Sequence, residues 1–97
     1  MKALGLIEVS GVTAAVDCLD IMCKSANVEL VTWERKLGGR LVTVVVEGDV
    51  SAVSAAVDNA MRCPVKTPVA HAVIARPHDE TRRLVELSAS RIRPKGE

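Results

Sequence analysis

The 97-residue chain carries a net charge of +1 at pH 7, so no strong electrostatic field draws it to nucleic acid or to a membrane surface. Hydrophobic residues make up 48% of it, yet it has one Trp and no Phe or Tyr, so its core must be built from aliphatic side chains. A single domain of this length buries only about 60–65% of its unfolded surface, which favours oligomerisation as a source of further burial.

The first half of the chain predicts a strand, an amphipathic helix and two further strands. Apolar residues favour a strand over residues 3–9, and apolar residues spaced by three and four favour a helix over residues 12–25. Residues 28–35 predict a second strand in which both faces are mixed. Residues 41–47 are almost continuously apolar and β-branched, which is typical of a central strand. A glycine-containing turn, residues 36–40, joins these two strands.

The second half predicts a helix, a strand and a short charged helix. Apolar spacing favours a helix from residue 50 to 61, prolines then break the chain, and residues 69–75 predict the fourth strand. The last helix is expected from Asp79 to about Leu87. No periodicity follows it, so residues 88–97 are expected to form a polar, flexible tail, with a weak anion or cargo contact as the alternative.

This order of elements predicts an α+β fold of the ferredoxin-like βαββαβ type. Its four-stranded antiparallel sheet would carry the two main helices on one face, with a short C-terminal helix added.

The cysteines and the N-terminal residues predict a reducing, cytoplasmic environment. Cys18, Cys23 and Cys63 are odd in number and lack disulfide or zinc spacing, so buried free thiols are expected. Met1-Lys2 leads directly into a strand pattern, which does not resemble a signal peptide. No apolar run approaches the roughly 20 residues that a membrane-spanning helix needs.

The titratable residues form no recognisable catalytic or metal-binding pattern. His71 lies within an apolar strand, where a core or interface position is expected; His78 precedes a helix, a position compatible with capping, pairing or exposure. These histidines and Cys63 do not have the spacing of a metal site. Cys18 and Cys23 lie on a predicted helix with no histidine in register to activate them. We therefore expect no enzyme, no metal and no cofactor.

Four short motifs carry a resemblance to a known family. In chain order they are Ala3-Leu4-Gly5-Leu6-Ile7-Glu8, Lys24-Ser25-Ala26-Asn27-Val28, Lys36-Leu37-Gly38-Gly39-Arg40 and Ala75-Arg76-Pro77-His78. Over residues 2–87 the chain resembles the hexamer-forming, single-domain shell protein of bacterial microcompartments. The resemblance implies a shell domain over residues 1–87, followed by the tail at 88–97.

The resemblance implies that the turn between the second and third strands lines a central pore for small metabolites. The pore-lining residues would be Leu37, Gly38, Gly39 and Arg40. The common family pattern is a lysine, an aliphatic residue and then Gly-Ser-Gly or Gly-Gly-Gly. This chain departs from it at Arg40, and its turn is one residue longer.

Arg40 suggests a basic pore mouth. Six guanidinium groups near one axis would favour anions and repel cations. The alternative is that Arg40 turns away and pairs with Glu34 or with an acid of a neighbouring subunit.

The resemblance also implies an edge at which hexamers meet. It comprises Lys24, Asn27, Arg76, Pro77 and His78. The stem of Lys24 would lie on its symmetry mate, and the planar fork of Arg76 would donate hydrogen bonds to carbonyl groups across the contact. The alternative for Lys24 is a lysine that interacts with the C-terminal end of its own helix dipole.

The expected function is that of a structural shell protein whose hexamers tile into a sheet. Its partners would be further copies of itself, other shell proteins and encapsulated enzymes, and neither nucleic acid nor a membrane would be involved. Its location would be the microcompartment shell in the cytoplasm. The alternative is a ferredoxin-like regulatory domain that senses small molecules, a hypothesis that rests on fold analogy.

Overall fold

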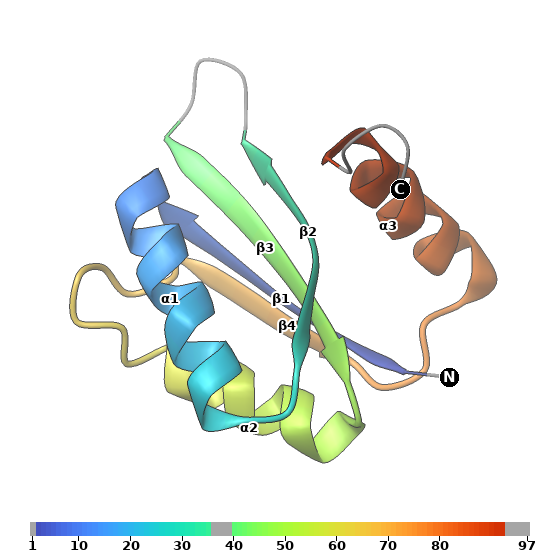
Figure 1. Ribbon diagram of the computed structural model, residues 1–97, viewed down its shortest axis with the longest axis horizontal. Coiled ribbons are helices and arrows are strands. Elements are labelled where there is room, and N and C mark those ends of the chain that lie inside the picture. Colours follow the sequence, from blue (N-terminus) through green and yellow to red (C-terminus); the bar gives the residue numbers. More distant parts are fainter. Residues whose placement is uncertain (1, 36–39, 93–97) are drawn as a thin grey trace.

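The computed structural model describes residues 2–35 and 40–92. Within these residues the elements are β1 (Ala3–Ser10), α1 (Val12–Ser25), β2 (Glu29–Arg35), β3 (Leu41–Gly48), α2 (Val50–Ala60), β4 (Ala70–Ile74) and α3 (Asp79–Ile92). The strands form one antiparallel sheet in the order β2-β3-β1-β4 (Figure 1). This order confirms the predicted ferredoxin-like plan.

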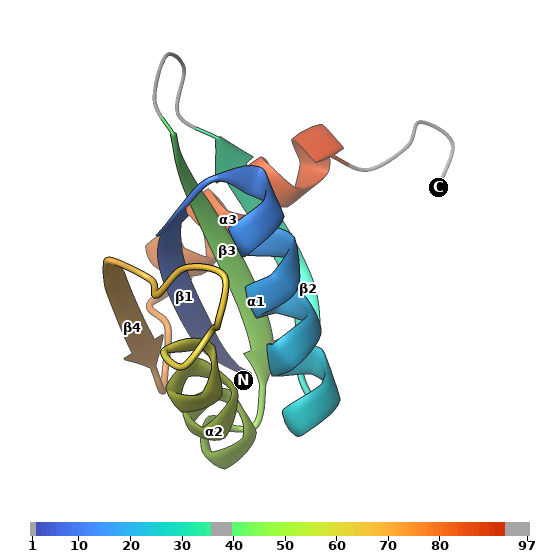
Figure 2. The ribbon, with the colours of Figure 1, turned by 90° about the vertical axis from the view of Figure 1, so that its left-hand side faces the viewer.

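The helices form two unequal layers. The two main helices, α1 and α2, pack on one face of the sheet, whereas α3 lies on the opposite face against β2 (Figure 2). The predicted end of the last helix at Leu87 is wrong, because α3 continues to Ile92 and buries Ala89. Residues 93–97, the rest of the expected tail, lie outside the described residues.

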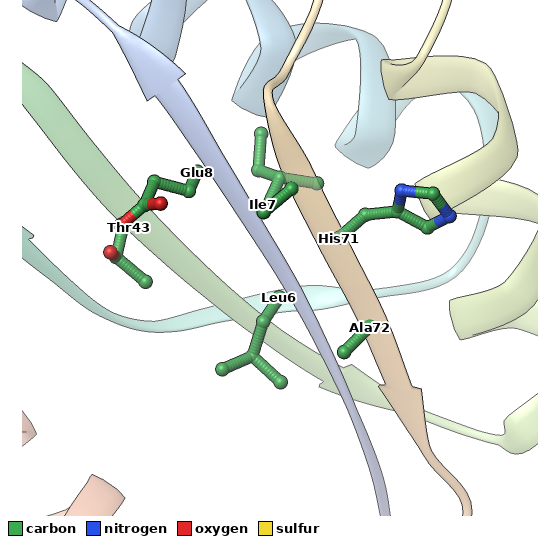
Figure 3. Close-up of a pocket in the computed structure, with 7 residues that line it drawn as sticks. Leu6, Ile7, Glu8, Thr43, His71 and Ala72 are labelled. Carbon is green, nitrogen blue, oxygen red and sulfur yellow. The ribbon is translucent and has the colours of Figure 1, made fainter.

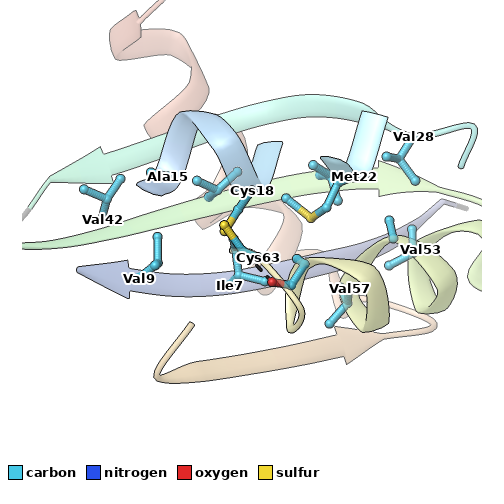
Figure 4. Packing of buried hydrophobic residues seen from close by; sticks show 14 of the residues in the cluster. Ile7, Val9, Ala15, Cys18, Met22, Val28, Val42, Val53, Val57 and Cys63 are labelled. Atoms are coloured by element: carbon cyan, nitrogen blue, oxygen red, sulfur yellow. Dashed lines mark hydrogen bonds between the residues drawn. The ribbon is translucent and has the colours of Figure 1, made fainter. Parts of the chain in front are cut away.

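The core between the sheet and α1 and α2 is aliphatic, as the composition predicted. Figure 4 shows side chains from β1, β3, α1 and α2 packed between these elements. Gly5 lets β1 and α2 pack closely, because a Cβ atom at residue 5 would lie 2.7 Å from Cγ1 of Val53 on α2. A methyl group at residue 5 would therefore require the Val53 side chain or α2 itself to shift.

A β-bulge in β2 resolves the mixed pattern of that strand. The register shifts between Leu30 and Thr32, so that Leu30 is opposite Val46 and Trp33 is opposite Val44. Leu30 and Trp33 are three residues apart and would face opposite sides of a regular strand. The shift places both of them on the α1 side of the sheet. Thr32, opposite Val45, consequently faces α3.

Hydrogen bonds and an ion pair hold α3 on the sheet. The Ser88 hydroxyl lies 2.8 Å from the buried Thr32 hydroxyl and donates a hydrogen bond to the Glu34 carboxylate. Near the start of α3, Arg82 donates to the Lys2 carbonyl oxygen over 2.7 Å and lies 3.7 Å from the Glu47 carboxylate. Small and polar residues thus attach α3 to the sheet. Because such residues give no apolar periodicity, the sequence did not indicate where α3 ends.

We predict that Ser88→Ala destabilises the protein by about 1–2 kcal/mol, because it leaves the buried Thr32 hydroxyl without its partner. Chemical denaturation followed by circular dichroism measures this change. Ser90→Ala is the matched control, since the exposed Ser90 hydroxyl donates its hydrogen bond to the Leu87 carbonyl oxygen of its own helix. Equal stability of the two variants would contradict the role of Ser88.

Candidate functional site

The two groups of residues expected to function lie at opposite ends of the sheet. The turn at residues 36–40 joins the end of β2 to the start of β3. The motifs around Lys24 and Arg76 lie where β2 begins and where β4 ends, and the antiparallel register brings these points to the other end (Figure 1). A strand of eight residues separates the two ends by about 26 Å.

Arg40 is the one expected pore residue that the structure describes; Leu37, Gly38 and Gly39 lie outside the described residues. Arg40 is exposed, and its carbonyl oxygen accepts a 2.7 Å hydrogen bond from the backbone N–H of Gly11. Gly11 has a positive φ of 100°, a conformation that favours glycine, and immediately precedes α1. The base of the turn is therefore attached to the start of α1.

The alternative pairing of Arg40 with Glu34 does not occur within the described part of this subunit. The carboxylate of Glu34 instead accepts a hydrogen bond from Ser88 on α3. Of the three positions expected for Arg40, the pore-facing position and the contact with an acid of a neighbouring subunit therefore remain as predictions.

Lys24 lies in the last turn of α1, with 77% of its side chain exposed. Its ammonium nitrogen is 2.7 Å from Oδ2 of Asp20, one helical turn earlier, where an acid before a base is a favourable pair. The hydrogen bond to Asp20 raises the pKa of Lys24, so the lysine stays charged. Position and charge also suit an interaction with the helix dipole, so the two readings of Lys24 are compatible.

The remaining expected edge residues differ in exposure. Asn27 and Arg76 are exposed, whereas Pro77 is buried within the subunit. His78 is exposed and caps α3: its Nδ1 accepts a 3.0 Å hydrogen bond from the backbone N–H of Glu80, and its carbonyl oxygen accepts one from that of Arg82. Pro77 and His78 therefore fix the chain that presents Arg76.

His71 does not lie in the core, so the core alternative for this residue is wrong. It is exposed on β4, an edge strand, while the interface alternative stays a prediction. Beside it, a shallow hollow of about 200 Å³ opens on the sheet face, lined by Leu6, Ile7, Glu8, Thr43, Ala70, His71 and Ala72. In Figure 3 the His71 ring points away from Leu6 and Ala72.

The cysteines are free thiols in the described structure, but only two of them are buried, so the expectation is wrong for Cys23, which is exposed. The Cys63 thiol donates a 3.2 Å hydrogen bond to Oδ2 of Asp17. Burial, together with the neighbouring Cys63, raises the pKa of Cys18 from an ordinary 9.0 to about 12. A protonated, enclosed thiol such as that of Cys18 is a poor nucleophile.

A search of residues 2–35 and 40–92 gives no group of three or more metal-ligating side chains able to hold an ion. Within the same residues, no helix has the length and apolar character needed to cross a membrane.

Comparison with known proteins identifies the class. The BMC domain family matches residues 3–77, so the chain belongs to the family of bacterial microcompartment shell proteins. This is a family of structural proteins, which decides against an enzyme and against the sensing domain.

Individual relatives agree with this class. The chain is 47% identical over 87 residues to the microcompartment shell protein PduA of Citrobacter freundii, covering 87% of this chain and 91% of PduA. It is 46% identical over 81 residues to the carboxysome shell protein CcmK2 of Synechococcus elongatus, covering 79% of this chain and 78% of CcmK2. A microcompartment protein structure from Desulfitobacterium hafniense shares the fold, with a TM-score of 0.76 at 22% identity over 91% of this chain and 48% of that one.

We predict that one thiol per chain, Cys23, reacts rapidly with Ellman's reagent at pH 8, and that Cys18 and Cys63 react only on unfolding. We also expect the free energy of unfolding to fall as pH rises from about 9 towards about 12. The unfolded chain loses the Cys18 proton in this range while the folded chain keeps it, so alkali favours unfolding.

Absorbance at 412 nm and denaturation at several pH values measure these effects. Cys23→Ser should remove the rapid reaction and keep the pH dependence, whereas Cys18→Ala should reduce the dependence. Rapid labelling of all three thiols in the folded protein would contradict the burial described above.

Proposed function

We propose that this chain forms hexameric tiles of a microcompartment shell, with the turn at residues 36–40 around a central pore and the opposite end of the sheet at the rim. The observation that carries the proposal is the separation of the two motif groups by the length of one sheet. A ring subunit needs this polarity if one end is to approach a rotation axis while the other meets a neighbouring ring.

At the rim, Lys24, Asn27 and Arg76 supply exposed polar contacts between hexamers. Asn27 borders a polar depression lined also by Lys2, Glu29, Glu47, Gly48 and Asp49, so acceptors for a neighbour's arginine lie close by. Pro77 and His78 support Arg76 indirectly, because they fix the direction in which the chain enters α3.

Further shell proteins meet the tile at the same edges, because lateral packing requires a common edge. Encapsulated enzymes meet one of its two flat faces. Passage of small metabolites through the pore supplies those enzymes.

At the pore, Arg40 forms a basic ring. Its exposure and its place at the base of the turn support this role. Six like charges repel one another, so the guanidinium groups extend into water or hold counterions, and both arrangements attract anionic metabolites.

We predict that Lys24→Asp or Arg76→Ala leaves single hexamers intact and abolishes extended sheets, because each change removes a rim contact and no core contact. Native mass spectrometry measures the ring, and negative-stain electron microscopy measures the sheets. Arg83→Ala is the control, since Arg83 is an exposed arginine on α3 paired with Glu80 at 2.9 Å. Normal tiling by both rim variants would defeat the assigned edge.

We predict that Arg40→Ala lowers the entry of small anions into assembled shells several-fold while cation entry is unchanged or rises, because the ring of positive charge is lost. Stopped-flow measurement of an encapsulated, ion-sensitive dye reports both rates. Arg35→Ala, at an exposed arginine on the same hairpin that ends β2, is the matched control. Unchanged anion entry in the Arg40 variant would rule out the basic ring.

A further inference from the structure

Two cysteines meet in the otherwise aliphatic core. Cys18 lies on α1 and is fully buried, and Cys63 follows the end of α2 and is 4% exposed. Figure 4 shows the two side chains next to each other between these segments. The Cys63 side chain contacts the Cys18 thiol. The two sulfur atoms are therefore neighbours in the fold, although they are far apart in the sequence.

The Cys18 sulfur lies where three segments of the chain come together. It is 4.0 Å from the carbonyl oxygen of Ala60, at the end of α2, and 4.0 Å from that of Lys66, in the connection to β4. The Ala60 carbonyl oxygen also accepts a 3.1 Å hydrogen bond from the backbone N–H of Cys63. A covalent bond at this point would join α1 to the end of α2 and to the connection that follows it.

Cys63 is the thiol of the pair that lies closer to solvent. Its hydrogen-bond partner is the carboxylate of Asp17, 3.2 Å away, and Asp17 is only partly buried. No helix or strand holds residues 61–69, so a local opening of this connection needs much less free energy than unfolding of the subunit. A small neutral oxidant can therefore reach Cys63 under conditions in which the bulky, charged Ellman's reagent does not.

We propose that Cys18 and Cys63 form an internal disulfide when the protein is exposed to a peroxide, and that this disulfide stabilises the folded subunit. In a reducing compartment both thiols stay free, as they are in the structure. The proposal concerns a property of the single subunit and does not depend on the proposed ring.

The reaction with hydrogen peroxide needs no further reagent. The Cys63 sulfur loses its proton and attacks one peroxide oxygen. The O–O bond breaks, the departing hydroxide takes up the proton as water, and Cys63 becomes a sulfenic acid. The Cys18 sulfur then attacks the Cys63 sulfur, the S–O bond breaks, and the hydroxyl group leaves with the Cys18 proton as a second water. Both sulfur atoms are oxidised, and one peroxide molecule is reduced.

The surroundings of Cys18 make this reaction slow. A pKa of about 12 leaves little Cys18 thiolate at neutral pH, and Cys18 is the attacking group of the second step. The pair therefore responds to sustained exposure and not to a brief pulse. Because the neighbouring thiol is already in contact, disulfide formation is favoured over further oxidation of Cys63.

The disulfide stabilises the subunit by restricting the unfolded chain. It closes a loop from residue 18 to residue 63, nearly half of the sequence, and a closed loop of this length removes many unfolded conformations. In the folded state the two side chains already touch, so the bond requires little movement of α1 or of the end of α2.

The test uses the full chain with Cys23→Ser, so that the exposed thiol cannot react. After prolonged incubation with excess hydrogen peroxide, a thiol count in denaturant should fall from two to none, and dithiothreitol should restore both. The oxidised protein should melt roughly 10 °C above the same sample after reduction. This comparison isolates the disulfide, because dithiothreitol does not reverse peroxide oxidation of methionine.

Cys63→Ala in the same background is the matched control. It should fold, which circular dichroism checks, and dithiothreitol should not change its melting temperature after the same treatment. Peptide mapping of the unreduced protein should join the Cys18 and Cys63 peptides of one chain.

Three results would overturn the proposal. One is a pair of thiols that persists through prolonged exposure of the folded protein. Another is a loss of thiols that dithiothreitol does not restore, since this indicates oxidation of Cys63 beyond the sulfenic acid. The third is a disulfide that forms and lowers the melting temperature, because the bond would then strain the folded subunit.

Discussion

The pairing of β1 with both β3 and β4 is the constraint on which the rest of the structure depends. β1 is opposite β3 from Ala3 to Ser10 and opposite β4 from Leu4 to Glu8. Because both neighbours run antiparallel to it, every connection must emerge at one of two ends of the sheet. This geometry separates the glycine turn from the lysine and arginine motifs, and it makes β2 and β4 the two edges.

The aliphatic composition has a consequence for assembly. Valine and alanine make up most of the buried cluster between the sheet and its two helices. The single tryptophan lies outside this cluster, on edge strand β2, beside other exposed aliphatic residues. A subunit of this size gains much of its remaining burial from contacts with further copies, which is consistent with a family of shell proteins.

In the proposed tile, the chain between β4 and α3 combines two tasks. Pro77 is buried and His78 caps the helix, so these residues serve the subunit itself. Arg76, directly before them, is exposed. A rigid attachment lowers the entropy lost when the arginine binds a neighbour, so a cap and a buried proline can strengthen a contact that they do not touch.

The sequence by itself determined the order of the elements, the aliphatic core and the family resemblance, because these depend on local periodicity, composition and short motifs. Only the tertiary structure decided what depends on contacts between distant segments: the bulge that turns Leu30 and Trp33 to one face, and the exposure of His71 on an edge strand. The docking of α3 through Ser88 to Thr32 and Glu34 was likewise hidden, because serine and alanine carry no apolar periodicity and their partners lie more than fifty residues away in the chain.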